Sequence, residues 1–114
     1  MTATASPAYL GNPAHVDPEE AFVASVSSCH MLTFLALALK QKFVIDSYVD
    51  EAVGHLDKNA DGKLAITRVE LHPRIEWSGD RKPSVEEVDK LHHLAHENCF
   101  IASSVKTEVT VAKL

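Results

Sequence analysis

Basic residues are scarce in this sequence. Its 11 Lys and Arg are outnumbered by 16 Asp and Glu, the net charge is -5 at pH 7, and residues 1–39 contain no Lys or Arg. Nucleic-acid binding depends on clustered Lys and Arg, so the composition argues against a nucleic-acid partner. A secretory signal needs a basic segment ahead of its apolar stretch. Since that segment is missing, we expect a cytoplasmic protein.

Cysteine is equally sparse, because Cys29 and Cys99 are the only two. They form no C-x-x-C motif, which excludes a thioredoxin-type redox site. In a cytoplasmic protein, distant cysteines are more often free thiols, redox partners or metal ligands than a structural disulfide. A chain of 114 residues buries enough surface to fold without a disulfide. We therefore expect a single domain over residues 1–114.

The first regular element should be a helix over about residues 18–41, after an irregular leader over residues 1–16. Asp17 is a predicted N-cap, with a proline at the first helical position and Glu20 closing a capping box. Apolar residues cover nearly the whole circumference over residues 31–39, which predicts a helix buried on most sides. Interrupting polar residues and missing basic anchors favour a buried central helix over a membrane span.

A β-hairpin is predicted next, because β-branched and aromatic residues follow Phe43 and a turn sequence occupies residues 59–62. The apolar phase slips between Ile66 and Val69, which predicts a bulge or a strong twist in the second strand. Pro73 should limit the ladder at or near an edge.

Two further elements complete the predicted fold. Ser84 and Glu87 form a capping box that begins a helix over about residues 84–97. Strict alternation over residues 105–111 predicts a last strand with one buried face. The order helix, hairpin, helix, strand predicts an α+β fold in which an antiparallel sheet packs on the long central helix and the second helix.

The residues leave the chemistry of the cysteines open. Cys29 lies among apolar residues, where burial raises the pKa of a thiol and makes it an inert core residue unless a cation compensates. His92, His96 and Cys99 have the spacing of metal ligands on one helical face, and Cys29 or His30 could complete a zinc site. A partly exposed helix face that carries histidines is the other interpretation of that spacing.

A family resemblance narrows these alternatives. Pro18-Glu19-Glu20 ahead of Ser28-Cys29-His30-Met31, the hairpin, and the helix ending in His96-Glu97-Asn98-Cys99 together resemble the osmotically induced protein and organic hydroperoxide resistance (OsmC/Ohr) family. The resemblance extends over about residues 10–112. It rests on the joint spacing of these motifs, since each one alone is weak.

This resemblance implies a thiol peroxidase without a cofactor. Cys29 matches the peroxidatic cysteine, Cys99 the resolving cysteine, and Glu19 the carboxylate that positions an arginine beside the thiolate. The implied partners are an organic hydroperoxide substrate and an external dithiol or lipoyl reductant. The family also implies an intertwined OsmC-like homodimer.

One departure from the family concerns the arginine. In the family it lies on N-terminal strands ahead of the first cysteine, whereas nothing basic precedes Cys29 here, so the resemblance implies a short form without those strands. Arg74, Arg81 or a residue of a partner subunit could replace that cation. The alternative function is an OsmC-like binding or redox-sensing protein without efficient peroxidase activity.

Overall fold

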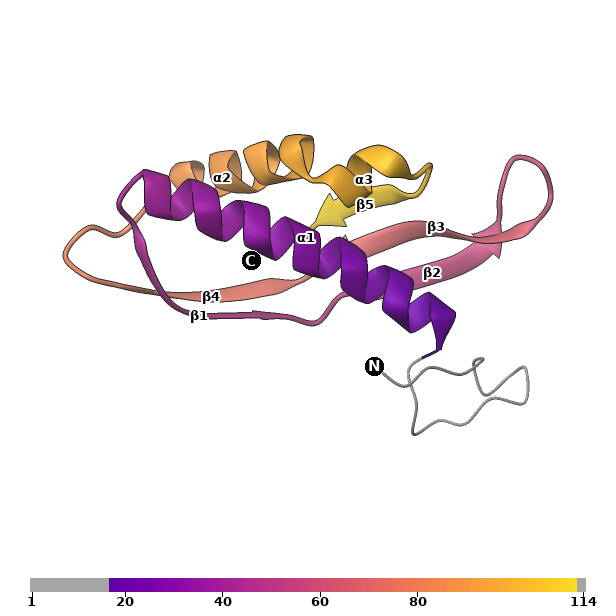
Figure 1. The fold of residues 1–114 in the computed structure, drawn as a ribbon, viewed down its shortest axis with the longest axis horizontal. Helices are drawn as coiled ribbons and strands as arrows, with labels where there is room; N and C mark the ends of the chain where they lie inside the picture. Colours follow the sequence, from indigo (N-terminus) through magenta and orange to yellow (C-terminus); the bar gives the residue numbers. More distant parts are fainter. Residues whose placement is uncertain (1–16, 113–114) are drawn as a thin grey trace.

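The computed structural model describes residues 17–112, so the predicted leader over residues 1–16 lies outside the described part (Figure 1). A long helix, α1 (Pro18–Lys40), crosses the front of the strands, and a second helix, α2 (Val85–Asn98), lies beside it. The α+β fold class and both predicted helices are confirmed. The predicted N-cap of α1 forms, since the Asp17 carboxylate accepts the Glu20 N–H at 2.7 Å, but among the described residues Glu20 does not close the predicted capping box. Ser84 with Glu87 makes the complete capping box of α2 as expected.

The strands form a long ribbon that is broken in the middle. β2 (Val53–Lys58) and β3 (Leu64–Leu71) make the predicted hairpin, and β1 (Val44–Asp50) pairs antiparallel with β4 (Pro73–Ser78) beyond the break. The register shifts opposite Leu56, where Thr67 is the extra residue on β3. This is the predicted bulge.

The last strand corrects the predicted antiparallel sheet. A short helix, α3 (Phe100–Ser104), leads into β5 (Glu108–Val111), which pairs with β3 in parallel. The reason is the connection: the chain leaves β3 through β4, α2 and α3, and such a crossover returns a strand in the parallel sense. The three-stranded sheet β2–β3–β5 is therefore mixed.

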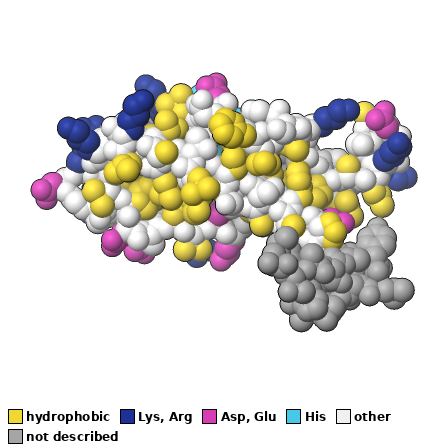
Figure 2. Space-filling view, viewed as in Figure 1, with side chains coloured by type: hydrophobic (Ala, Val, Ile, Leu, Met, Phe, Trp, Pro, Cys, Tyr) yellow, Lys and Arg dark blue, Asp and Glu magenta, His cyan; other side chains and the backbone are white. Residues whose placement is uncertain are grey.

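Within this chain α1 is buried along one stripe only, which corrects the prediction of burial on most sides. Val26, His30, Phe34 and Ala38 are buried at every fourth position, whereas Leu32 and Leu39 are 61% and 73% exposed. Figure 2 shows hydrophobic side chains gathered along this outward side of the molecule. By length and composition α1 is able to cross a membrane, but here it packs as the central helix of the fold.

Two apolar clusters hold α1 in place. One contains Phe34 of α1 and Leu91 and Ala95 of α2, with Tyr48 and Trp77 packed against it. The other joins Val26 of α1 to Val69 and Leu71 of β3. Because α1 takes part in both, the positions of its side chains are fixed against α2 and against the sheet.

Candidate active site

The structure brings the two cysteines together at the junction of the helices. Cys29 lies in the middle of α1 and is partly buried, whereas Cys99 is 1% exposed and lies between α2 and α3. Both are free thiols, and their side chains lie close enough for each to shift the pKa of the other. A pair of thiols in contact is chemically able to form a disulfide on oxidation.

The environments of the two thiols differ. Burial raises the pKa of Cys29, but hydrogen bonds from the Cys99 side chain and from the backbone N–H groups of Ile101 and Phe100 outweigh it, so this pKa lies below its ordinary value. For Cys99, burial raises the pKa and the contact with Cys29 raises it further. Cys29 is thus the sulfur that ionises first, with Cys99 as its hydrogen-bond donor.

The predicted histidine and cysteine face is not assembled as a metal site. α2 ends at Asn98, and Cys99 has the extended angles φ -76 and ψ 114, so its side chain leaves the face that carries His92 and His96. Over residues 17–112, no group of three His, Cys, Asp or Glu side chains is placed to hold a metal ion.

Glu19 lies in the first turn of α1 and lines a groove of about 690 Å³ along the N-terminal half of that helix. Its Oε2 atom is buried and has no hydrogen-bond partner within the described range. Ser28 and Met31 line the same groove, but Cys29 does not. In the described part of the chain, no hydrogen bond or ion pair joins Glu19 to Cys29.

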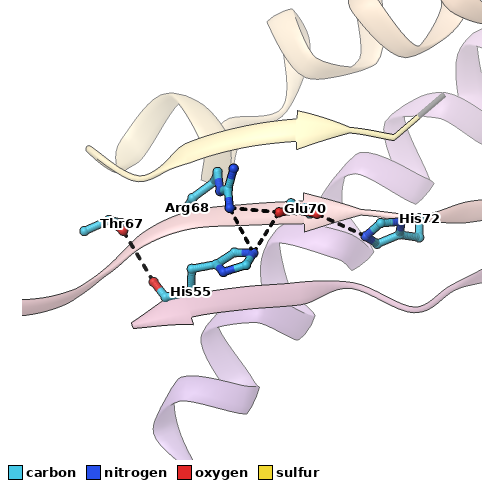
Figure 3. Close-up of polar contacts among 5 residues, drawn as sticks. All are labelled: His55, Thr67, Arg68, Glu70 and His72. Carbon is cyan, nitrogen blue, oxygen red and sulfur yellow. Dashed lines mark hydrogen bonds and ion pairs between the residues drawn. The ribbon is translucent and has the colours of Figure 1, made fainter. Parts of the chain in front are cut away.

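The arginines are engaged elsewhere. Arg68 contacts Glu70 at 3.0 Å, in a cluster where His55 and His72 also converge on this carboxylate (Figure 3). Arg74 and Arg81, named above as possible replacements, are paired with Glu51 at 4.0 Å and Glu87 at 3.9 Å. Among residues 17–112, no Lys or Arg contributes to the lowered pKa of Cys29.

A buried histidine pair adjoins the thiols, and the sequence had suggested its two members only as possible zinc ligands. His30 Nε2 lies 3.0 Å from His92 Nδ1, the two rings stack with centroids 5.2 Å apart, and the His92 ring lies 4.4 Å from that of Phe34. Burial, with a smaller effect of His92 and His96, lowers the pKa of His30 to about 4. The signal in the sequence was a histidine in the apolar stripe of α1 opposite a histidine-rich helix, which spacing alone could not pair.

Comparison with known proteins supports the resemblance. A profile of OsmC-like proteins matches residues 11–112. No curated protein matches the chain. An OsmC-like protein of unknown function from Vibrio cholerae shares 54% identity, with a TM-score of 0.91 over 96% of this chain and 71% of that chain.

More distant solved structures share the fold. An organic hydroperoxide resistance protein from Legionella pneumophila is 19% identical, with a TM-score of 0.72 over 96% of this chain and 79% of that chain. Another, from Elizabethkingia anophelis, is 21% identical, with a TM-score of 0.73 over 96% of this chain and 78% of that chain. At these identities the likeness is one of architecture.

Proposed function

Because this chain belongs to the OsmC-like protein family, we propose that it is a thiol-dependent peroxidase that reduces organic hydroperoxides. The observation that carries the proposal is the contact between Cys29 and Cys99, in which only Cys29 has a lowered pKa. A peroxidatic cysteine must ionise and must have a second thiol within reach. The lowered pKa of Cys29 and the nearness of Cys99 support this assignment.

The reaction balances with these two thiols and an external reductant. The Cys29 thiolate attacks the distal oxygen of the hydroperoxide, the O–O bond breaks, and the alkoxide takes a proton and leaves as the alcohol. Cys29 is then a sulfenic acid, and the Cys99 thiol attacks its sulfur, which releases water and forms the disulfide. An external dithiol or lipoyl group returns both thiols by exchange and is itself oxidised to a disulfide.

In the described part of this chain hydrogen bonds, rather than a neighbouring cation, lower the pKa of Cys29. A neighbouring positive charge lowers a thiol pKa by roughly 1 to 3 units. Here the lowering comes instead from the Cys99 thiol and the N–H groups of Ile101 and Phe100. The unpaired Oε2 of Glu19 leaves a carboxylate to receive a cation from outside residues 17–112, and we propose Glu19 as the positioning carboxylate.

The alternative function, binding or redox sensing, rests on the surroundings of Cys29. With no Lys or Arg beside Cys29 among residues 17–112, a slow thiol in an OsmC-like protein would serve binding or redox sensing rather than turnover. The rate of reaction with peroxide separates the two functions.

We also propose that the protein is a cytoplasmic homodimer. Leu32, Leu39 and Phe100 are 61%, 73% and 82% exposed in the single chain, and burying apolar surface of this kind is favourable by about 25 cal/mol per Å². A second copy would cover the outward side of α1. Sedimentation that shows a monomer at micromolar concentration would remove this part of the proposal.

The decisive experiment titrates the reduced protein with cumene hydroperoxide and with hydrogen peroxide, while free thiols are counted and disulfides are located by mass spectrometry. We expect rapid stoichiometric loss of both thiols with the organic peroxide and a Cys29–Cys99 disulfide. Cys29→Ser should abolish peroxide consumption, whereas Cys99→Ser should stop at a sulfenic acid that dimedone traps.

A matched control is Ser103→Ala, which changes an exposed residue of α3 near the thiols. It should consume peroxide at the unaltered rate. Thiols that survive excess organic peroxide in the unaltered protein would exclude the peroxidase and favour the binding or sensing function.

A further inference from the structure

A cluster of three histidines lies at the seam between α1 and α2 that also carries the thiols. His30 is 1% exposed, and it is bonded to His92 through Nε2 and Nδ1 at 3.0 Å. His96 is close enough for its charge to act on His30. Cys29 directly precedes His30, and Cys99 follows the end of the helix that carries His92 and His96.

The bond between His30 and His92 requires at least one neutral ring. A neutral imidazole has one N–H donor and one acceptor nitrogen, but an imidazolium has two donors and no acceptor. When both rings are protonated, the pair has no acceptor at all, and two like charges face each other across 3.0 Å. The neutral pair therefore joins the helices, and the doubly protonated pair repels them.

Few neighbouring groups stabilise a proton added to the buried rings of His30 and His92. His30 Nδ1 and His96 Nδ1 are buried without partners over residues 17–112, so no acceptor there receives an added proton. From the strands, β1 presents the buried Tyr48 hydroxyl, which has no partner in the described range, and the Asp50 carboxylate. The Asp50 and Asp89 carboxylates favour protonated His92, whereas burial lowers the pKa of both His30 and His92.

We propose that His30 and His92 form an acid-sensitive contact that holds Cys29 against Cys99 while the rings are neutral and separates the two helices when both rings are protonated. This contact regulates the pair Cys29 and Cys99, so its biological role rests on the proposed function. The contact itself depends only on the packing of α1 on α2, and it is measurable without peroxide.

The pH range follows from the direction of the shift. The ordinary pKa of histidine is 6.5, and the pKa of His30 in the fold is about 4. The neutral contact is complete above pH 6.5 and is lost as the pH falls through about 4. Acidification within this range is the predicted signal.

The chain contains its own reporter, because Trp77 is the only tryptophan and its ring lies 6.0 Å from Phe34, which packs on His92. Trp77 fluorescence and the fraction of Cys29–Cys99 disulfide in a fixed dithiothreitol redox buffer would be followed from pH 7.5 to pH 3.5, together with NMR titration of each imidazole. We expect Trp77 and the disulfide fraction to change together with the titration of His30.

Three variants test the assignment. His92→Gln and His92→Phe remove a charge that lowers the pKa of His30, and Phe also keeps a ring against Phe34. In both variants the pKa of His30 should rise, so the Trp77 midpoint should move to higher pH by about one unit or more. His93→Gln changes an exposed neighbour on the same helix, paired with Glu97, and should titrate like the unaltered protein. His92 variants with an unchanged midpoint, or a His93 variant that shifts equally, would overturn the proposal.

A fourth variant separates this proposal from the peroxidase proposal. Cys29→Ser/Cys99→Ser has no thiol chemistry but should keep the Trp77 transition. If the transition persists in this variant and the unaltered protein does not consume peroxide, the acid-sensitive contact stands and the peroxidase fails. The disulfide fraction of the unaltered protein should depend on pH differently from that of the His92 variants. If Trp77 fluorescence changes with pH but the two disulfide fractions have the same pH dependence, the link between the contact and the thiols is wrong.

Discussion

Replacing Gly54 by alanine tests how closely β2 packs on α1. A Cβ atom at this position would lie 2.5 Å from Val23 Cγ2, with Ile66 Cγ2 at 3.6 Å. Carbon atoms in contact prefer roughly 3.5–4.0 Å, so the new methyl group overlaps Val23 by about 1 Å. Val23 cannot easily turn away, because a β-branched side chain in a helix has one strongly preferred rotamer.

The expected loss of stability follows from two opposing effects. Overpacking of this kind destabilises a fold by about 1–3 kcal/mol. Restricting the unfolded chain by a Gly to Ala change restores about 0.4–1 kcal/mol. The free energy of unfolding should therefore fall by about 1–2 kcal/mol, which lowers Tm by roughly 4–8 °C in a domain of this size.

Urea and thermal unfolding at one fixed protein concentration would measure this loss, since self-association makes stability depend on concentration. Val23→Ala should make room for the new methyl group, so the double variant should show a coupling of about 1 kcal/mol or more. Gly62→Ala is the control: its φ of +74 is unfavourable for alanine, but no atom lies within 4 Å, so its effect should not depend on Val23. A neutral Gly54→Ala, or strict additivity with Val23→Ala, would refute the reasoning.

Two further predictions concern unusual polar groups. Tyr48→Phe should leave the free energy of unfolding unchanged or raise it by up to about 1 kcal/mol, because the hydroxyl is buried without a partner over residues 17–112. Tyr48→Leu removes the ring 5.8 Å from Phe34 and should lower the free energy of unfolding in the same urea assay. A destabilised Tyr48→Phe would mean that the hydroxyl has a partner. The pKa of Glu70 lies below 4.5 because of the hydrogen bond from His55 and, to a smaller extent, the charge of Arg68, so its stabilising effect is complete above pH 4.5 and is lost as the pH falls through the lowered pKa. In Glu70→Gln, Tm should therefore fall less steeply with acidification than in the unaltered protein, and an equal slope would contradict this assignment.

Much of the fold was predictable because its signals are local. Asp17 and Ser84 cap their helices as the sequence indicates, since a cap involves only the next three residues. The hairpin turn and the bulge at Thr67 were equally readable, because turn chemistry and the alternation of side chains are set within a few residues. The parallel pairing of β5 was not, because pairing sense depends on the path of the chain between distant strands.

Only part of the candidate site could be predicted from the sequence. The family resemblance predicted Cys29, Cys99 and Glu19 as site residues, which stays a prediction, and the sequence placed Cys29 correctly within α1. His92, His96 and Cys99 would share one face only if the helix continued to Cys99, but α2 ends at Asn98. One residue at a helix end is beyond what periodicity determines, although it decides the direction of a side chain.

The sequence by itself therefore determined the helices, the hairpin and the family, because each is encoded in neighbouring residues or in a fixed spacing. Tertiary structure alone decided that Cys99 donates to Cys29, that His30 bonds to His92, and that Glu19 Oε2 is left without a partner among residues 17–112. These contacts join segments far apart in the chain. They arise from the packing of α1 on α2 and on the strands, and no local pattern specifies the distance or the angle at which two packed elements meet.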